Sequence, residues 1–207
     1  MLIYRVIRSR WNSDSQSVYL IETDLDNHPL NSENEGWIDE YQLFEIWDYE
    51  KAKPLIMARL KEENLDQGYL NETRDRFGNG DRLLLISSKE PLSFIFISTS
   101  SAYFNQVGHT EPLPDSCFSV YDVYTFKKHR GKGLYRITLS LATKAMYAKG
   151  FTKFWLWVMK HNKVSVMVHD RLGVNQVIAV FTEYFKFGKR VFRKEEVRIK
   201  LSTLLDE

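Results

Sequence analysis

Several short segments of the chain combine β-branched and aromatic residues with alternating polar positions, a pattern that predicts β-strands. In the first two thirds of the chain these segments are residues 2–9, 17–23, 82–88, 92–100 and 117–126. The short turn at 89–91 separates two of them and predicts a hairpin. The polar segment 11–36, broken only by 17–23, predicts a loop, as does the stretch around Pro112 and Pro114.

Helical spacing of apolar residues predicts two helices in the first third of the chain. Trp37, Tyr41 and Phe44 recur at intervals of three and four residues, so we expect a helix within residues 36–50. A second helix is expected to start at Pro54, which a first helical turn tolerates, and to end before Gly68. The segment 77–81 then predicts a turn.

The boundaries of the predicted elements are clearest in the last third of the chain. An apolar stripe that starts at Leu134 predicts a helix that ends at Gly150. Residues 151–159 predict a buried strand, and Asn162 stands where the N-cap of a further helix, ending at Gly173, is expected. Segments 177–187 and 195–202 predict a final antiparallel pair. This order of elements predicts an α/β fold with a mixed sheet and about four helices.

Length and composition favour one globular domain over residues 1–207, because 207 residues are enough to bury a sizeable core. No run approaches the ~18 apolar residues of a membrane span, and no signal peptide is recognised, so we expect a cytoplasmic protein. Cys117 is the single cysteine, which excludes an intrachain disulfide and indicates a core residue. The histidines and carboxylates show no metal-ligand spacing, so no metal is expected.

The charge is divided unevenly although the net charge is only +2. Residues 1–126 hold 11 Lys and Arg against 21 Asp and Glu, whereas residues 127–200 hold 18 against 4. Such asymmetry indicates an anion-binding half, and a basic surface balanced by an acidic one is the alternative. The anion could be a phosphorylated ligand or a nucleic acid.

The run Arg130-Gly131-Lys132-Gly133 lies between a predicted strand and a predicted helix. Unpaired N–H groups at a helix N-terminus, glycines that allow close approach and neighbouring positive charges together suit a pyrophosphate. A P-loop would need Ser or Thr after Lys132, and a dinucleotide fingerprint would need glycine where Arg136 stands. A plain strand-to-helix turn is the alternative.

Two motifs in order resemble the GCN5-related N-acetyltransferase (GNAT) superfamily across residues 117–187. The family signature Gln/Arg-x-x-Gly-x-Gly/Ala reads here from Lys128 to Gly133, with Lys in place of the first Gln or Arg. The second signature pairs a strand and Asn162 with a Leu-Gly-aromatic unit eleven residues on, where Val174 replaces the aromatic residue. The resemblance implies a mostly antiparallel sheet of about seven strands, with acceptor-side helices in residues 1–116 and the last strand and tail in 188–207.

The resemblance also implies the donor and its contacts. Acetyl-coenzyme A would be the acyl-donor substrate, with its pyrophosphate on the glycine turn and its pantetheine arm beside the preceding strand. The expected contacts are Val123, Tyr124 and Thr125 with the arm, Arg130, Gly131, Lys132, Gly133, Leu134 and Tyr135 with the phosphates, and Asn162 with the arm.

Acyl transfer to an amine needs a base for the amine and an acid for the leaving thiolate. Many family members place a tyrosine acid four residues before the Leu-Gly glycine, a position that His169 occupies here. His169 is therefore the candidate acid, with a hydrogen-bonded helix histidine as the alternative. Asp122 is the candidate base, with an ion pair as the alternative.

The predicted function is transfer of an acetyl group from acetyl-coenzyme A to an unidentified primary amine by direct attack in a ternary complex. Ten acidic residues between positions 22 and 50 suggest a cationic amine, or else a solvated acidic loop. A nucleic-acid-associated protein and a non-catalytic coenzyme A-binding or partner-binding protein stay as alternatives, and a homodimer stays open. No membrane partner is expected.

Overall fold

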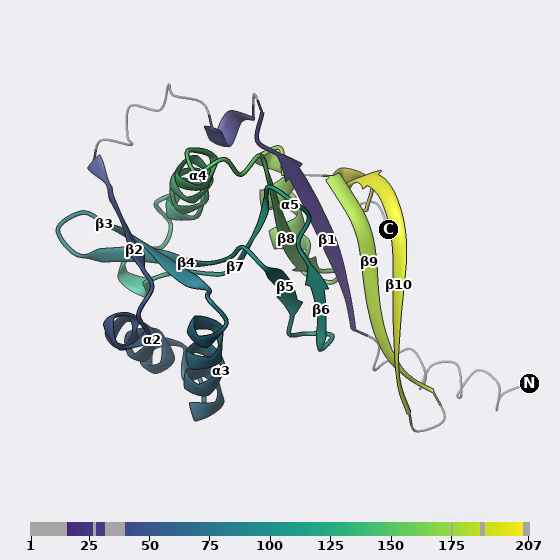
Figure 1. The fold of residues 1–207 in the computed structure, drawn as a ribbon, viewed down its shortest axis with the longest axis horizontal. Helices are drawn as coiled ribbons and strands as arrows, with labels where there is room; N and C mark the ends of the chain where they lie inside the picture. The colour runs from purple at the N-terminus through teal and green to yellow at the C-terminus, as the bar shows by residue number, and fades with distance from the viewer. Residues whose placement is uncertain (1–15, 27, 32–39, 175, 187–188, 205–207) are drawn as a thin grey trace, which may run out of the picture. The chain divides into compact units, whose positions relative to one another are not determined.

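The computed structural model describes residues 16–26, 28–31, 40–174, 176–186 and 189–204, and the strand expected at 2–9 lies outside them (Figure 1). The chain forms two compact units. Within the described residues, unit 1 comprises the chain up to Thr23, Tyr103–Glu111 and the chain from Trp155 onward. Unit 2 comprises Asp24–Ala102 and Pro112–Phe154.

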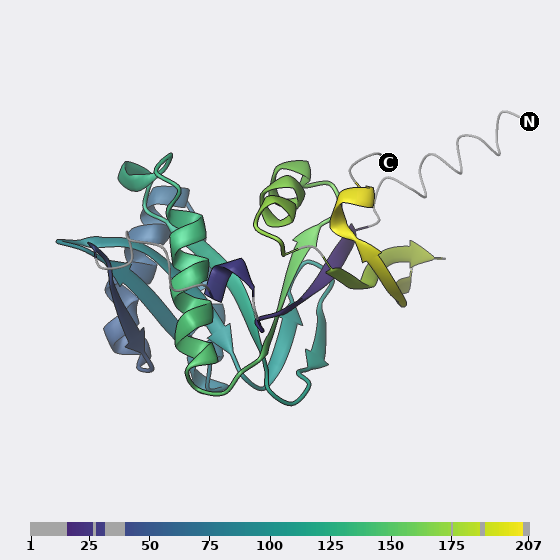
Figure 2. The same ribbon diagram turned by 90° about the horizontal axis from the view of Figure 1, so that it is seen from above.

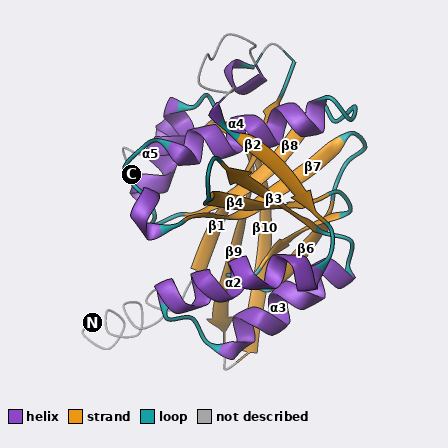
Figure 3. Cartoon of the chain, turned by 90° about the vertical axis from the view of Figure 1, so that its left-hand side faces the viewer, coloured by secondary structure: helices purple, strands orange, loops and turns teal. Residues whose placement is uncertain are grey.

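Unit 2 is a four-stranded antiparallel sheet between helices. The strands run in the order β2 (Gln42–Ile46), β3 (Arg82–Ser87), β4 (Pro91–Ser98) and β7 (Cys117–Thr125). Figure 3 shows α4 (Leu134–Tyr147) on one side of these strands and α2 (Tyr49–Glu63) and α3 (Gln67–Gly78) on the other. Alternate strand residues therefore face two separate cores, one under each layer of helices.

The core under α2 and α3 is rich in aromatic rings. Phe94, Phe96 and Phe126 are buried there with Tyr124, and the Phe94 and Phe96 ring centroids lie 6.1 Å apart, edge to face. The core under α4 is smaller and built mainly from Ile and Leu side chains. Figure 2 shows the short turn Pro29–Asn31 beside α4, where Ser140 Oγ donates to the Leu30 carbonyl at 2.8 Å.

Unit 1 holds β1 (Gln16–Asp24), β9 (Gln176–Lys186) and β10 (Lys189–Lys200), together with β8 (Lys153–Met159) from Trp155 onward. β9 pairs antiparallel with both β1 and β10. The helix α5 (Lys163–Arg171) follows β8. Two short strands, β5 (Ser101–Phe104) and β6 (His109–Pro112), form a separate hairpin.

β8 is the fourth strand in the sheet order β10-β9-β1-β8-β7-β4-β3-β2. It begins in unit 2, where the Thr152 and Lys153 N–H groups donate to the Ser116 carbonyl at the start of β7. The predicted α/β class is confirmed, with a mostly antiparallel sheet of eight strands where about seven were expected.

The expected strand at 17–23, the hairpin at 82–100, the helix from Leu134, the helix after Asn162 and the final antiparallel pair are all confirmed. Cys117 is buried at the start of β7, as expected for a core residue. The short hairpin β5–β6 was missed because strands of four residues give little periodic signal.

The helix expected within residues 36–50 is wrong for residues 42–46, which form the edge strand β2, whereas Tyr49 and Glu50 belong to α2. Tyr41 and Leu43 pack against the core under α4, whereas Ile46 packs on the opposite core, so the segment follows a period of two. Three aromatic residues at helical spacing did not outweigh pairing with β3, which places Phe44 opposite Leu85. Trp37 lies outside the described residues.

The second expected helix begins earlier than predicted. Asp48, rather than the residue before Pro54, caps α2, and its Oδ1 accepts the Glu50 N–H at 2.8 Å. Pro54 thus lies inside the helix. The expected end before Gly68 is correct, but α3, capped by Asp66, was missed, and it takes up part of the turn expected at 77–81. Among the described helices, none is both long and apolar enough to cross a bilayer.

Candidate functional site

The turn between β7 and α4 depends on two glycines with left-handed backbone. Gly131 has φ of 77° and Gly133 has φ of 70°, a region that other residues adopt only at a cost. A Cβ atom built on either glycine would have no neighbour within 4 Å. The glycines therefore serve the backbone conformation and leave the turn open to an approaching ligand.

The N-terminus of α4 carries unpaired backbone donors. Gly133 occupies the cap position and supplies no side-chain cap. The Arg136 and Ile137 amides donate to the Gly133 carbonyl, at 3.1 and 3.5 Å. Within the described residues, no backbone carbonyl accepts the N–H groups of the four positions from Gly131 to Leu134. Such a helix end suits an anion, because its amides and its dipole both present positive charge.

Carboxylates from the end of α2 hold the basic residues of the turn in place. Arg130 Nη2 donates to Glu63 Oε1 at 2.7 Å, and Arg130 Nε donates to the Thr125 carbonyl at 3.0 Å. The Lys127 N–H donates to Glu62 Oε2 at 3.0 Å. The Arg130 guanidinium lowers the pKa of the Glu63 carboxyl. These acidic partners lie more than sixty positions away in the sequence, so local patterns did not predict them.

A small hollow of about 270 Å³ adjoins the turn on the side of Lys132. His129 lines it and is buried, with Nε2 3.2 Å from Glu90 Oε1. Lys128 Nζ also donates to Glu90. The remaining lining residues are Glu40, Tyr41, Ser88, Lys89, Leu92 and Leu134. Basic side chains thus surround the turn, and those of Lys127, Lys128 and Arg130 pair with carboxylates.

β7 carries a β-bulge directly before the turn. Phe94 of β4 pairs with Tyr124 and Phe96 pairs with Tyr121, so Asp122 and the following residue together oppose a single residue of β4. Asp122 has a left-handed backbone with φ of 52°. Strict alternation, which would place Tyr121 and Tyr124 on opposite faces, fails here, because both pack on the core under α2 and α3.

The carboxylate of Asp122 is buried between two arginines. Its Oδ1 accepts from Arg59 Nη1, and its Oδ2 accepts from Arg76 Nη1 at 2.6 Å and from the Tyr69 hydroxyl at 3.1 Å. Burial alone would raise the pKa of Asp122, but the guanidiniums of Arg59 and Arg76 hold that pKa below its usual range. A carboxylate stabilised in this way is a weak proton acceptor, which argues for the ion-pair alternative.

Asn162 and His169 lie in unit 1, on α5. Asn162 Oδ1 accepts the Ser165 N–H at 3.0 Å, which confirms the expected N-cap. His169 is buried, and its Nδ1 lies 2.7 Å from the Ser165 carbonyl. Because a carbonyl only accepts, Nδ1 carries the proton of the neutral ring. Burial lowers the pKa of His169 to about 4, so the ring is neutral at pH 7, which argues against a general acid.

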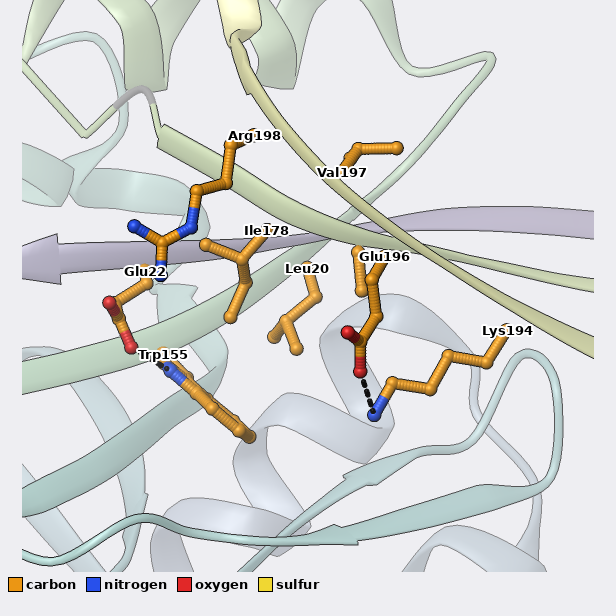
Figure 4. Close-up of a pocket in the computed structure, with 9 residues that line it drawn as sticks. Leu20, Glu22, Trp155, Ile178, Lys194, Glu196, Val197 and Arg198 are labelled. Atoms are coloured by element: carbon orange, nitrogen blue, oxygen red, sulfur yellow. Dashed lines mark hydrogen bonds and ion pairs between the residues drawn. The ribbon is translucent and has the colours of Figure 1, made fainter.

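Unit 1 also contains a hollow of about 520 Å³ over its sheet (Figure 4). Leu20 and Ala179 line it beside the indole of Trp155, whose Nε1 donates to Glu22 Oε2 at 3.0 Å. Side chains of both charges surround it, and the complete lining adds Ile178, Lys194, Glu196, Val197 and Arg198. Among the described residues, no group of three His, Cys, Asp or Glu side chains could hold a metal ion.

Comparison with known families agrees with the glycine turn. Residues 35–174 match the model of the acetyltransferase (GNAT) family, which is more than half of the chain. The chain belongs to the GNAT family. The match includes the turn, β7, α4, β8 and α5, and it therefore contains every candidate site residue.

Solved structures are similar to this chain at low sequence identity. A conserved Staphylococcus epidermidis protein of unknown function is 9% identical, with a TM-score of 0.51 over 93% of this chain and 64% of that one. A Drosophila protein is 11% identical, with a TM-score of 0.50 over 95% and 54%. A GCN5-related N-acetyltransferase from Kribbella flavida is 16% identical, with a TM-score of 0.44 over 76% and 53%.

The chain therefore spans about half to two thirds of the length of these three structures. No curated protein matches the chain.

Proposed function

We propose that the chain is an N-acyltransferase that transfers an acetyl group from acetyl-coenzyme A to a primary amine. Membership of the GNAT family supports the reaction class. The observation that carries the proposal is the open, uncapped turn at the N-terminus of α4, with its two left-handed glycines and its flanking cations. A pyrophosphate is the kind of group that such a turn binds.

In this proposal the amides from Gly131 to Tyr135 and the side chains of Arg130 and Lys132 bind the phosphates. The pantetheine arm runs beside Val123, Tyr124 and Thr125 of β7, and Asn162 of α5 faces the arm. The bulge supports the contact of the arm with β7, because it interrupts the regular register of this strand at Asp122 and Val123. Bound acetyl-coenzyme A supplies the activated thioester.

The reaction forms a C–N bond as the amine attacks the thioester carbonyl, and it breaks the C–S bond. The amine loses a proton and the leaving thiolate gains one. A base role for Asp122 and an acid role for His169 stay predictions, and the contacts of both residues weigh against them. The simpler explanation is then that water, or the amine itself, carries the proton from the attacking nitrogen to the leaving thiolate.

A matched pair of glycine variants tests the donor site. Gly133→Ala places a Cβ at φ of 70° in the turn, and Gly150→Ala places one at φ of 91° after the far end of α4. Neither Cβ meets an atom within 4 Å, so both variants carry a similar backbone cost. Acetyl-coenzyme A at a hundredfold excess over Kd should stabilise the wild type by about 2.7 kcal/mol, seen as a raised Tm.

We expect Gly150→Ala to keep this ligand-induced rise in Tm and Gly133→Ala to lose most of it. A wild type whose Tm does not respond to acetyl-coenzyme A would contradict the proposed function. Equal ligand-induced rises in Tm in the two variants would show that the phosphates do not bind at this turn.

The acceptor is proposed only as a primary amine. Several of the acidic residues that suggested a cationic amine have structural partners. Glu45 accepts from Arg82 at 2.7 Å and from Lys149 at 2.6 Å, and Asp48 caps α2. A screen of polyamines, aminoglycosides and basic peptides beside neutral amines will show whether positive charge matters.

A further inference from the structure

Two side chains from the helices that cover β7 bind the carboxylate at its β-bulge. Arg59 comes from α2 and Arg76 from α3, and both donate to the carboxylate of Asp122 at the bulge. Each oxygen of this carboxylate accepts from a different guanidinium. The Asp122 side chain is only 14% exposed, so water competes little for these bonds.

The same two arginines also stack on the tyrosines that flank the bulge. The Arg76 guanidinium lies over the Tyr121 ring, 4.9 Å from its centroid, on the side before the bulge. The Arg59 guanidinium lies over the Tyr124 ring, also at 4.9 Å, on the side after it. Cations over aromatic faces are attracted by the ring electrons. The contacts therefore fix positions 121, 122 and 124 at once.

A left-handed backbone at a residue with a side chain persists only where surrounding contacts determine it. Asp122 meets this condition through three donors, Arg59, Arg76 and Tyr69. We infer that Arg59, Asp122 and Arg76 form a bulge clamp, which sets the backbone of β7 and so positions Val123, Tyr124 and Thr125 for the acyl donor.

Only one part of this inference rests on the proposed function, namely that β7 is positioned for the acyl donor. The members of the bulge clamp are positioning residues, because they act through β7. The clamp also links α2 and α3 to the donor strand, so a change in either helix would be transmitted to the acyl group. If Asp122 only balanced the charge of the two arginines, any other change that neutralises them would restore the properties of the wild type.

Hydrogen–deuterium exchange of the full chain without ligand tests the structural step. Asp122→Asn keeps the side-chain size and tolerates the left-handed backbone but removes the charge. We expect the amides of residues 121–125 to exchange about tenfold faster in this variant. Glu72→Gln is the matched control, because it removes a second carboxylate that pairs with Arg76, at 2.6 Å, without touching β7. Exchange in β7 should not change in the control.

A double variant separates positioning from charge balance. Asp122→Asn leaves two buried guanidiniums without their shared carboxylate, so its Tm should fall. Adding Arg76→Met removes one of these cations, and part of the lost Tm should return while β7 still exchanges fast. Recovery of both the Tm and the slow exchange would overturn the clamp. If Asp122→Asn does not fold, Arg76→Lys takes its place, because it keeps the charge but loses the planar fork.

Kinetics test the functional step. Because the phosphates bind the glycine turn, Asp122→Asn should change the Kd of acetyl-coenzyme A less than about threefold, while kcat falls about thirtyfold or more. A wild type that does not bind acetyl-coenzyme A would defeat the proposed function, and the exchange data would still decide the clamp. A functional wild type beside an Asp122→Asn variant with unchanged kcat and unchanged exchange would show the clamp to be wrong.

Discussion

His169 shows how environment decides what a residue can do. The GNAT motif places it where a proton donor is common, but burial keeps the ring neutral, and the hydrogen bond to the Ser165 carbonyl only partly opposes this effect. With a pKa of about 4, only about one ring in a thousand is protonated at pH 7. The sequence predicts the position of His169 on α5, whereas its protonation depends on packing that the sequence does not show.

The depressed pKa of His169 has a consequence for acid stability. The native ring binds its proton near pH 4, and the unfolded ring binds it near the usual 6.5. Between these values the unfolded state holds more protons, so stability is lost as the pH falls from 6.5 to 4. The loss is on the order of 3 kcal/mol.

Urea unfolding across this pH range measures the effect. His169→Gln, which cannot titrate, should show a flatter dependence of the free energy of unfolding on pH than the wild type. Equal slopes in the two proteins would mean that the pKa of His169 is the same in the folded and unfolded states.

The elements around the glycine turn were predictable because each is bounded by a local signal. Gly133 opens α4, Gly150 follows its end, and Asn162 caps α5. The edge strand β2 was not predictable, because its pairing with β3 outweighs the helical spacing of its aromatic residues. The turn was therefore visible in the sequence, whereas Arg59 and Arg76 reach Asp122 from 63 and 46 positions away and leave no local pattern.

Asn162 combines a structural role in α5 with a proposed contact to the pantetheine arm, and two variants separate these roles. Asn162→Ala removes the cap and should cost about 1 kcal/mol of stability. Asn162→Asp retains an oxygen for the Ser165 N–H and should keep the stability of the wild type. Chemical denaturation measures both.

If the amide of Asn162 contacts the arm, Asn162→Asp should still raise the KM for acetyl-coenzyme A, because a carboxylate cannot donate a hydrogen bond. An unchanged KM in a variant of normal stability would limit Asn162 to its capping role.

At the scale of the whole molecule, the uneven charge has structural explanations in each unit. In unit 2, acidic residues of α2 and of the β3–β4 turn pair with the basic turn, as in the Glu63–Arg130 contact. In unit 1, the edge strand β10 carries most of the positive charge of its hairpin and is largely exposed. Charged side chains on an edge strand discourage pairing with other chains. The basic half thus needs no nucleic acid to explain it.

We therefore expect weak, non-specific binding of nucleic acid. Fluorescence anisotropy with a labelled single-stranded oligonucleotide should show affinity that disappears between about 50 and 200 mM salt, as purely electrostatic contacts do. Binding that survives 200 mM salt, or that prefers one sequence, would restore the nucleic-acid alternative.

The β-bulge at Asp122 also bears on how this chain could be made more stable. A chain with one residue fewer at this point could pair β7 with β4 without interruption and would need no left-handed aspartate. Later residues of β7 would keep their faces, because Phe96 and Phe94, the partners of Tyr121 and Tyr124, are two residues apart, but the backbone that the bulge clamp holds would be gone. Thermostability selection without an activity screen would therefore favour shortening this strand, and the shortened variants would lose the donor geometry.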